Sequence, residues 1–394
     1  MADTHLGYEQ YNLSERRDDF DNAFSEVVEK VLELRPDFVI IAGDLFHHAR
    51  PSNITLERAV RNFRRLKEAN IPVLVVDGSH DHAPNVVTGT ILNPLDTAGL
   101  ICYLPRHDGA CWENDYCYVY GIPNFRTRER FEERISGFYS LKKPAPRKDK
   151  FNIFVFHMAL DTSEISSVFP RAAADASPNL IPDGFNYYAG GHIHAPIHFR
   201  LRGGIVAYSG STENVSYEDA AFMKGFYYVE VSRDMEVNLN YIKLERTRKF
   251  KVIERDYSGL HPKDIVEAAV KTVREADEAG AVIVPVLKGV LPVGASKKEI
   301  DLARIRSAAE KALIVHPIVF LRETEISEEI IKGIFNAGMK DLRTKSYEYF
   351  LQFFIQRNYS REEAEKRARA AIDLIQYLVR DDEGKVRKIL EELF

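Results

Sequence analysis

The chain has 394 residues, more than a single ordinary domain holds, so two or three domains are expected. Hydrophobic residues make up 45% and charged residues 29%, a mixture that excludes a disordered or a fibrous protein. Because the formal net charge is −5, a nucleic acid would have to be bound by a local basic surface and not by the charge of the whole molecule.

The first half of the chain alternates between short β-branched runs and helical patterns. Each run leads into a polar loop, as DFVIIA (37–42) leads into Gly43 and Asp44. Alternating strands and helices are typical of a layered α/β body, and polar residues just beyond the strand ends indicate its site. The strands are predicted at residues 37–42, 71–76, 151–156 and 187–189, and the helices at residues 18–34 and 54–69.

Beyond residue 204 the pattern changes to short strands and then reaches a basic segment at 245–251. A first domain boundary is therefore predicted near residue 250. The part that follows mixes helices with a strand, which indicates a small α/β capping domain. Its elements are predicted as a helix at 262–279, a strand at 281–287 and a second helix at 297–313.

The last part of the chain is almost wholly helical in pattern. Ser360 followed by Glu363 is a capping box, which predicts a helix that runs to about Val379. The stretch 347–355 is more apolar than one face of an isolated helix requires, and it suits either the core of a helical hairpin or a partner surface. The predicted organisation is a first domain at 1–250, an α/β capping domain at 251–325 and a C-terminal helical region at 326–394.

Cysteine usage and hydropathy bear on the compartment. Cys102, Cys111 and Cys117 are too few for a disulfide framework, and their spacing fits no zinc ribbon. No run of about 18 apolar residues occurs, and the N-terminus lacks the basic and apolar regions of a signal peptide. We therefore expect a soluble, cytoplasmic protein with no membrane partner.

Side chains that can bind a metal gather directly after the predicted strands. Carboxylate and imidazole together suit manganese, iron or zinc, whereas a magnesium or calcium site would consist mostly of oxygen. A lone histidine is more often a packed or surface residue, and a lone aspartate in such a place can merely cap a helix. Their joint occurrence on separate loops favours a metal site. The residues are Asp3, His5, Asp44, His47, His80, His157, His192 and His194.

Five motifs, in chain order, resemble the signature of the calcineurin-like metallophosphoesterases. Within that superfamily, the stretches ADTHLGY, IAGDLFHHARPS and YYAGGHIH resemble the Mre-eleven family of DNA double-strand-break repair nucleases, in its archaeal form. The motif set is highly specific and spans about the first 215 residues, and the remainder matches in layout alone. The motifs are Asp3-x-His5, Gly43-Asp44-x-x-His47, Gly78-Ser79-His80-Asp81, His157 and Gly191-His192-x-His194.

The resemblance implies an α/β fold, a two-layer β-sandwich flanked by helices, that holds two manganese ions (Mn2+). A carboxylate between two cations makes physical sense, because the pair can then clamp the attacking and the leaving oxygens of a phosphodiester. Carried over by position, Asp3, His5, Asp44 and His194 would hold one ion, and Asp44 would bridge to a second that His157, His192 and Ser79 complete. His80 and His47 would be catalytic, His80 by stabilising charge or protonating the leaving oxygen and His47 by orienting a ligand or the nucleophile.

Two positions depart from the family's pattern. Ser79 stands where the family has asparagine, and because a hydroxyl reaches about one bond less far than an amide oxygen, we expect the second ion to bind less tightly. Only Met1 and Ala2 precede Asp3, where the family has a central strand. Without the hydrogen bonds of that strand, Asp3 and His5 are expected to be the least firmly held ligands.

The resemblance also implies partners. Basic clusters at 61–67, 142–150 and 246–251 would contact double- or single-stranded DNA, although read alone such clusters are more often solvated surface. The helical region would dock on a Rad-fifty type, SMC-like ATPase. The apolar residues Ile54, Leu56, Val60, Phe63, Ile91, Leu92 and Leu95 would form a homodimer interface or face the sheet.

The function implied is a manganese-dependent nuclease, a duplex 3′-to-5′ exonuclease and single-strand endonuclease, in a prokaryotic, nucleoid-associated repair complex with the ATPase. The residues alone support only phosphoester hydrolysis by a metal site. One alternative is a small-substrate phosphodiesterase of the same superfamily. Another is a DNA-end tethering scaffold whose metal site is impaired by Ser79 and the short start.

Overall fold

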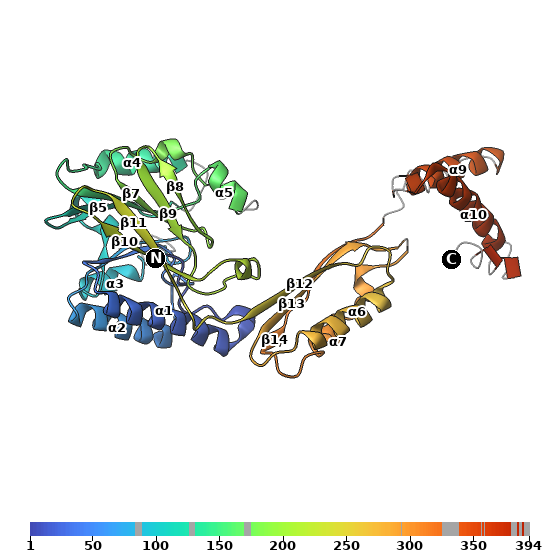
Figure 1. Cartoon of the computed structure of the whole chain (residues 1–394), viewed down its shortest axis with the longest axis horizontal. Coiled ribbons are helices and arrows are strands. Elements are labelled where there is room, and N and C mark those ends of the chain that lie inside the picture. Colours follow the sequence, from blue (N-terminus) through green and yellow to red (C-terminus); the bar gives the residue numbers. More distant parts are fainter. Residues whose placement is uncertain are drawn as a thin grey trace. The chain divides into compact units, whose positions relative to one another are not determined.

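The computed structural model describes residues 1–82, 89–125, 131–168, 175–292, 294–324, 339–355, 357, 359–379, 384–385 and 388–389. The chain divides into two compact units, whose elements are labelled in Figure 1. The first comprises Met1–Arg255, Ala269–Val286 and Leu302–Ile318, and the second comprises Asp256–Ala268, Leu287–Asp301 and Val319–Phe394. All the motif residues lie in the first unit, and the domain boundaries near residues 250 and 325 remain a prediction.

A three-stranded parallel sheet forms where the first strands are predicted. Its order is β1-β2-β3, with β1 at Val39–Ala42, β2 at Val73–Val76 and β3 at Cys102–Tyr103. Every residue of β2 is buried, as expected of a parallel strand that is covered on both faces. One face packs against α1 (Ser14–Leu34), α2 (Asn53–Glu68) and α3 (Leu92–Thr97).

The two long helices of this layer have recognisable ends and one buried face. The Ser52 hydroxyl accepts a hydrogen bond from the Thr55 amide at the start of α2, and Arg35 ends α1 in a left-handed conformation at φ 49°. On α1, Phe20, Phe24 and Val31 are buried on one side. Each such side chain contributes roughly 1.5–3 kcal/mol by its burial, which ties α1 to the sheet.

A six-stranded mixed sheet forms the second layer, in the order β4-β5-β6-β7-β9-β8. The inner strands β5, β6, β7 and β9 are parallel, and β4 and β8 are antiparallel edge strands. The outer face packs against α4 (Phe131–Leu141) and α5 (Ser163–Val168). The strands are β4 (Cys111–Glu113), β5 (Cys117–Gly121), β6 (Phe151–His157), β7 (Tyr187–Gly191), β8 (Pro196–Leu201) and β9 (Gly204–Ser209).

The inner faces of the two sheets pack on each other. Leu74 and Val76 of the first sheet share an apolar cluster with Val119 and Val155 of the second. Figure 1 shows α1 to α3 on one side of the paired sheets and α4 on the other. The predicted two-layer β-sandwich flanked by helices is confirmed.

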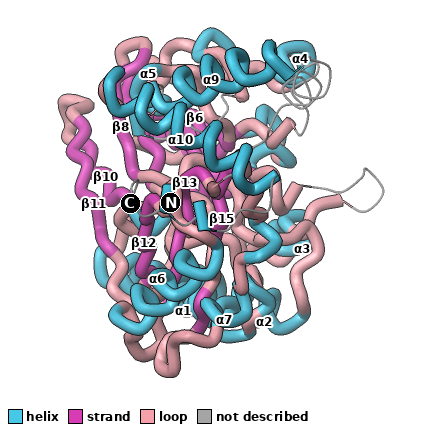
Figure 2. Tube along the Cα trace, turned by 90° about the vertical axis from the view of Figure 1, so that its right-hand side faces the viewer, coloured by secondary structure: helices cyan, strands magenta, loops and turns pink. Residues whose placement is uncertain are grey.

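An antiparallel ribbon follows the second sheet in the chain. It consists of β10 (Gly225–Val231) and β11 (Val237–Lys243), which pair along their whole length (Figure 2). Phe226 of this ribbon is buried in the same cluster as the residues of α1 and β1. The ribbon has no further strand partner among the described residues.

A separate four-stranded sheet follows the ribbon in the chain. It contains β12 (Phe250–Asp256), β13 (Val282–Val290), β14 (Ile314–Val315) and β15 (Ile318–Arg322), with the helices α6 (Pro262–Glu275) and α7 (Leu302–Arg306). The single helix predicted at 297–313 is wrong, because the structure has a 3-10 turn at Lys297–Glu299, an α-helix only at Leu302–Arg306 and a loop beyond it. The reason is Asp277, whose carboxylate accepts hydrogen bonds from the amides of Glu310, Lys311 and Ala312 at 2.9–3.2 Å and holds them in a loop.

The C-terminal part contains a helical hairpin of α9 (Met339–Ile355) and α10 (Arg361–Val379). The Ser360 hydroxyl accepts the amide of Glu363, so the predicted helix start is confirmed. Ala364, Ala368 and Ile372 are buried at helical spacing, whereas the aromatic side chains of α9 are only partly buried. Residues 325–338, part of the predicted helical region, lie outside the described residues. Among the helices described, none is both long and apolar enough to cross a membrane.

Candidate metal centre

The predicted site residues meet at the carboxyl ends of the parallel strands. The loop after β1 carries Asp44, the loop after β2 carries Ser79 and His80, and β6 ends in His157. His157 Nε2 lies 3.2 Å from Asp44 Oδ2, so the edges of the two sheets converge at this point. Residues that are more than a hundred positions apart in the sequence therefore form one cluster.

The start of the chain is fixed against the loop after β1. The amide of Asp3 donates to the carbonyl of Gly43 at 3.1 Å, and the amide of His5 donates to that of Asp44 at 3.0 Å. The Asp3 side chain is fully buried and His5 is 1% exposed. The expectation that these two residues are loosely held is therefore wrong, because hydrogen bonds to the loop after β1 hold their backbone in place.

The backbone of the site is strained. Asp3, His5, Asp44 and His192 have φ angles of 54°, 43°, 50° and 89°, a region that side-chain-bearing residues seldom adopt. Such conformations cost on the order of 1 kcal/mol or more each and persist where function requires them. The loops also approach closely, since a Cβ atom at Gly78 would collide with the Asp44 carboxylate.

Asp44 and His157 form the buried centre of the cluster. His157 Nδ1 donates to the carbonyl of Ala42 at 2.9 Å, which fixes the ring so that Nε2 faces Asp44. Burial opposes charge on His157, but the Asp44 carboxylate outweighs it and raises the pKa of His157 to about 10. Burial likewise opposes ionisation of Asp44, yet the positive His157 holds the pKa of Asp44 well below its usual range. A positive charge on or beside His157 is therefore stabilised by the ionised Asp44 carboxylate.

Asp3 and His5 add a second carboxylate and a second imidazole. Burial raises the pKa of Asp3 to about 6 and lowers the pKa of His5 well below its usual range. His5 Nε2 lies 3.8 Å from Asp44 Oδ2, and its Nδ1 lies 3.2 Å from His47 Nδ1. Tyr8 stacks on the His47 ring at 3.7 Å between centroids, which sets the orientation of that ring. His5 is therefore a neutral imidazole with a fixed plane.

His194 completes this half of the cluster. Its Nε2 lies 4.0 Å from Asp3 Oδ1, and its Nδ1 is hydrogen-bonded to Asp219 Oδ2 at 3.0 Å. Asp219 is fully buried, and the same oxygen accepts the amides of Val215 and Ser216 at 2.9 Å. The carboxylate thus fixes the tautomer of His194 and directs Nε2 toward the cluster.

The remaining predicted ligands are placed differently. The amide of His192 donates to both oxygens of Asp3 at 3.1 Å, and its ring lies beside His157, but its Nε2 faces Asp175 Oδ2 at 3.4 Å. Burial, reinforced by the positive His157, lowers the pKa of His192 to about 4. Ser79 Oγ donates to Asp44 Oδ2 at 3.3 Å. Ser79 and His192 thus contact the Asp44 and Asp3 carboxylates, but among the described residues His192 does not join a group of three acidic or imidazole side chains whose potential ligand atoms lie within 4.8 Å of one another.

His80 lies at the exposed rim. Its amide donates to Asp44 Oδ1 at 2.8 Å, and its ring Nδ1 donates to the carbonyl of His47 at 2.9 Å. The His80 and His47 rings stack at 4.6 Å, and the His5 ring lies 4.8 Å from His80. The exposed His80 therefore borders the cluster beside His5 and His47.

The donor set fits a divalent cation. Three groups at the site have potential ligand atoms within 4.8 Å of one another: Asp3 with His5 and His194, Asp3 with Asp44 and His157, and His5 with His47 and His80. The Nε2 atoms of His5 and His157 are buried and make no hydrogen bond in the described chain. Buried nitrogen atoms of this kind, aimed at carboxylates, are satisfied by a cation that takes the place of a proton. Carboxylate and imidazole are the ligands of manganese, iron and zinc.

Three acidic residues that support the site were not assigned this role from the sequence. Asp81 Oδ1 accepts the Gly78 amide and Oδ2 the Leu45 amide, both at 2.7 Å, so that it ties the loops after β1 and β2 together. Burial raises the pKa of Asp81 to about 8. Asp219 is hydrogen-bonded to His194 at 3.0 Å, and Asp175 Oδ2 lies 3.4 Å from His192 Nε2. Asp81 stood within a recognised motif, whereas nothing in the spacing of the other two pointed to the histidines they contact.

Comparison with known proteins supplies the family. A model of the calcineurin-like phosphoesterase family matches residues 1–196. The chain is similar to the DNA double-strand break repair protein Mre11 of Archaeoglobus fulgidus, with 31% identity over 358 residues that cover 84% of this chain and 75% of that protein. The chain belongs to the Mre11 family.

Other Mre11 proteins match comparable parts of the chain. The protein of Methanopyrus kandleri is 28% identical over 363 residues, which cover 87% of this chain and 76% of the relative. That of Methanocaldococcus jannaschii is 32% identical over 246 residues, which cover 60% of this chain and 63% of the relative. The resemblance of the sequence to the Mre11 family and to the calcineurin-like metallophosphoesterase fold is therefore confirmed.

Proposed function

We propose that this Mre11-family chain is a two-metal DNA nuclease that uses manganese, with duplex 3′-to-5′ exonuclease and single-strand endonuclease activity. The observation that carries the proposal is the cluster of Asp3, Asp44, His5, His157 and His194, in which two buried imidazole nitrogens find no hydrogen-bond partner among the described residues. The relatives are DNA double-strand break repair proteins, which supports DNA as the substrate.

In this proposal the ligands divide into two sets around Asp44. Asp3, His5 and His194 would hold one ion, and His157, His192 and Ser79 would hold the other. Asp44 would serve both, since its Oδ2 lies 3.8 Å from His5 Nε2 and 3.2 Å from His157 Nε2. When bound, the ions would supply the positive charge that activates water near neutral pH and stabilises the charge that develops on the phosphate. The protein's own part is to keep these donors deprotonated, oriented and dry.

In this proposal His47 accepts the ring proton of His5, and His80 donates a proton to the leaving group. With Nε2 of His5 directed at the cation, its Nδ1 bears the ring proton and donates to His47 Nδ1, so that His47 fixes the ligand's orientation. Burial, together with the neighbouring histidines, lowers the pKa of His47 to about 3 and keeps it a neutral acceptor. His80 holds a proton on Nδ1 through the His47 carbonyl, and its exposed Nε2 delivers a second proton to the leaving sugar oxygen.

The basic clusters differ in how much of their charge is available to DNA. At 246–251, Arg246 pairs with Glu29, and Arg248 pairs with Asp19, so this cluster mainly holds the fold together. In the cluster at 142–150, Lys142 donates to two backbone carbonyls, whereas Lys143 and Lys148 are exposed. We assign the phosphate contacts to the exposed pair.

A salt titration tests this assignment. Replacing Lys143 and Lys148 by glutamate removes two cations from the footprint, so the slope of log K against log salt concentration should become shallower by roughly 2. Fluorescence anisotropy with a labelled duplex measures the slope. Lys249→Glu is the matched control, because its charge is already paired with Glu278, and it should leave the slope unchanged. Equal slopes for the double variant and the unsubstituted chain would remove the pair from the DNA footprint.

Two partner surfaces accompany the nuclease proposal. The α9–α10 hairpin, with its partly exposed aromatic face, would dock on a Rad-fifty type ATPase. For a homodimer, Phe63 and Leu92 are fully buried, but Leu56 and Val60 line an open groove of about 640 Å³ together with Ile91, Leu95 and Leu100. The groove leaves an apolar strip on α2 that a second copy would cover.

Cleavage of an end-labelled DNA duplex tests the proposed function. We expect cleavage products with manganese, fewer with magnesium and none after chelation of the metal. Digestion from the 3′ end should give a ladder of shortened products when the label is at the 5′ end. Hydrolysis of a chromogenic small diester without cleavage of DNA would instead identify a small-substrate phosphodiesterase. Tight binding of DNA ends without any metal-stimulated cleavage would identify a tethering scaffold.

A further inference from the structure

Three residues with three different metal-binding groups lie together beside α3 and share no member with the candidate metal centre. Asp96 belongs to α3, Cys102 begins β3, and His107 follows the 3-10 turn at Leu104–Arg106. A carboxylate oxygen of Asp96, the sulfur of Cys102 and a ring nitrogen of His107 lie within 4.8 Å of one another. We call these three residues the α3 cluster.

The spacing of the α3 cluster suits a small divalent cation. Tetrahedral zinc, with bonds of about 2.0–2.3 Å, places its ligand atoms about 3.3–3.6 Å apart. His107 Nε2 lies 2.9 Å from Asp96 Oδ1, and the potential ligand atoms of the cluster are at most 4.8 Å apart. Shifts of about 1 Å or less therefore produce the tetrahedral spacing. The exposed ring of His107 can make such a shift without disturbing the core.

The carboxylate of the α3 cluster is oriented by its neighbours. The Tyr103 amide donates to Asp96 Oδ1 and Arg106 donates to Asp96 Oδ2, both at 3.0 Å. Arg106 also donates to two further residues of α3, which keeps it on the Oδ2 side. The Asp96 side chain is only 8% exposed. The arginine thus occupies one oxygen and leaves Oδ1 directed at His107.

The thiol of Cys102 determines the class of cation. Burial, reinforced by the Asp96 carboxylate, raises the pKa of Cys102 to about 11, so the side chain is not a reactive thiolate by itself. A thiolate ligand suits zinc, whereas manganese and magnesium prefer oxygen. The cluster around Asp44 contains carboxylate and imidazole but no sulfur. The two clusters therefore favour different metals.

We propose that the α3 cluster is a zinc site, with a water molecule as the fourth ligand. When zinc binds, the S–H bond of Cys102 breaks, the S–Zn bond forms and the proton passes to solvent. His107 binds through Nε2 and carries its ring proton on Nδ1. The ion links α3 to β3 and to the turn that follows. Because Pro94 and Leu95 of α3 line the open groove beside α2, zinc stiffens that wall of the groove.

Titration of the full chain with cobalt(II) tests the site, because cobalt replaces zinc at such sites and its bond to a thiolate absorbs strongly in the near ultraviolet. We expect this absorption band to appear with the unsubstituted chain, to disappear when zinc is added, and to be lost in Cys102→Ser. The cluster around Asp44 does not produce the band, since its ligands contain no sulfur. The band therefore reports the α3 cluster separately from the candidate metal centre.

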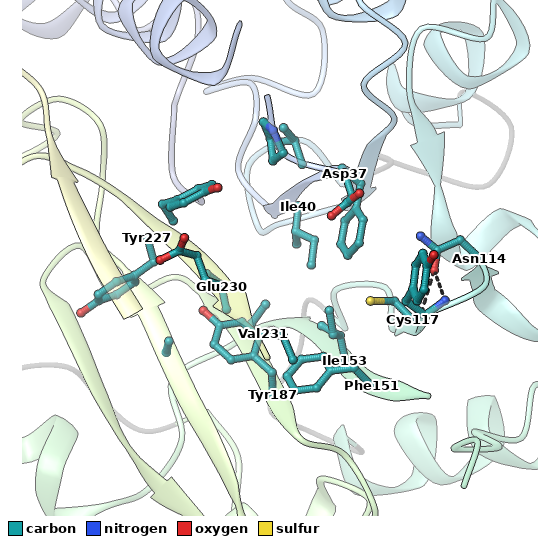
Figure 3. A pocket seen from close by; sticks show the side chains of 18 of the residues that line it. Asp37, Ile40, Asn114, Cys117, Phe151, Ile153, Tyr187, Tyr227, Glu230 and Val231 are labelled. Carbon is teal, nitrogen blue, oxygen red and sulfur yellow. Dashed lines mark hydrogen bonds between the residues drawn. The ribbon is translucent and has the colours of Figure 1, made fainter. Parts of the chain in front are cut away.

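The matched control is Cys117→Ser. Cys117 borders a cavity lined also by Ile40, Phe151 and Ile153 (Figure 3), and it belongs to none of the groups of potential metal ligands found in the described part of the chain. This variant should keep the full band. The proposal is overturned if the unsubstituted chain gives no band at saturating cobalt, if the band persists in Cys102→Ser, or if Cys117→Ser removes it equally.

A second variant, His107→Gln, tests the ligand set at little risk to the fold, because 44% of the His107 side chain is exposed. The cobalt concentration that gives half of the band should rise about tenfold or more. His198→Gln, which changes an exposed histidine outside the α3 cluster, should leave that concentration unchanged. Manganese-dependent cleavage of DNA should be equal in both variants. Equal cobalt affinities for the two variants would remove His107 from the site and overturn the proposal.

Discussion

The two halves of the candidate metal centre differ in how firmly the protein holds their histidines. In one half His5 contacts His47, which is stacked on Tyr8, and His194 is bonded to the fully buried Asp219. In the other half His192 faces Asp175, whose side chain is 24% exposed, and Ser79 offers only a short hydroxyl. All the histidines of the first half are therefore held in place before an ion binds, whereas in the second half only His157, bonded to the Ala42 carbonyl, is held in this way.

This difference indicates which residues are expected to set the affinity for metal. In the proposed division both halves share Asp44 and the same convergence of strands, so the fold alone would not set the affinity of each. What differs is the set of residues behind the ligands, which fixes ring planes and tautomers. We therefore expect two manganese-binding steps, a tighter one at Asp3, His5 and His194 and a weaker one at His157, His192 and Ser79.

The substitution Asp44→Asn should have the largest effect, because it removes the charge that both halves share. We expect the cleavage rate to fall at least about a thousandfold, with both binding steps weakened. Single-turnover cleavage and a manganese titration followed by electron paramagnetic resonance measure the two effects. Asn keeps the size of the side chain, so the fold should persist.

The matched control for this variant is Asp37→Asn. Asp37 is an exposed acid at the amino end of the same strand, and its replacement makes the same change in charge far along β1 from the ligands. Its cleavage rate should equal that of the unsubstituted chain. If Asp44→Asn weakened only one of the two binding steps, Asp44 would not be shared and the comparison of two halves around it would fail.

The next effect in size separates the halves directly. Asp219→Asn removes the charge behind His194, so manganese affinity in the first step should fall about tenfold. Asp175→Asn acts on a more exposed contact of His192 and should change the second step by no more than roughly threefold. Calorimetric titration resolves the steps. Equal losses for the two variants would mean that the supporting carboxylates contribute alike, and the proposed contrast would be wrong.

Much of the fold was predictable, because its strands and helices have strong local signals. The apolar run before Asp44 and the helical spacing of residues 54–69 matched β1 and α2 to within about two residues. The helix predicted at 297–313 failed for a tertiary reason. Asp277, which is more than thirty residues away, binds three successive amides there and overrides the local preference.

The residues that cluster at the candidate site were predictable from the sequence, but the residues and hydrogen bonds that position them were not. Asp3, Asp44 and His157 each follow a strand or stand in a motif, and parallel strands bring their carboxyl ends together. Asp219 contacts His194 through a loop whose path the sequence does not specify. Likewise, the amides of Asp3 and His5 bond to the loop after β1, a pairing that only three-dimensional packing reveals.

The smallest expected effect is a gain, from Ser79→Asn. Ser79 Oγ donates to Asp44 Oδ2 at 3.3 Å, and this short side chain reaches no further into the weaker half. An asparagine amide oxygen extends about one bond further and can ligate directly, so we expect the second manganese step to tighten several-fold while the first is unchanged. Ser79→Ala is the matched control, since it removes the hydroxyl without adding a ligand and should not tighten either step. If asparagine tightened the first step instead, position 79 would belong to the half that is already organised, and the division of the ligands would have to be redrawn.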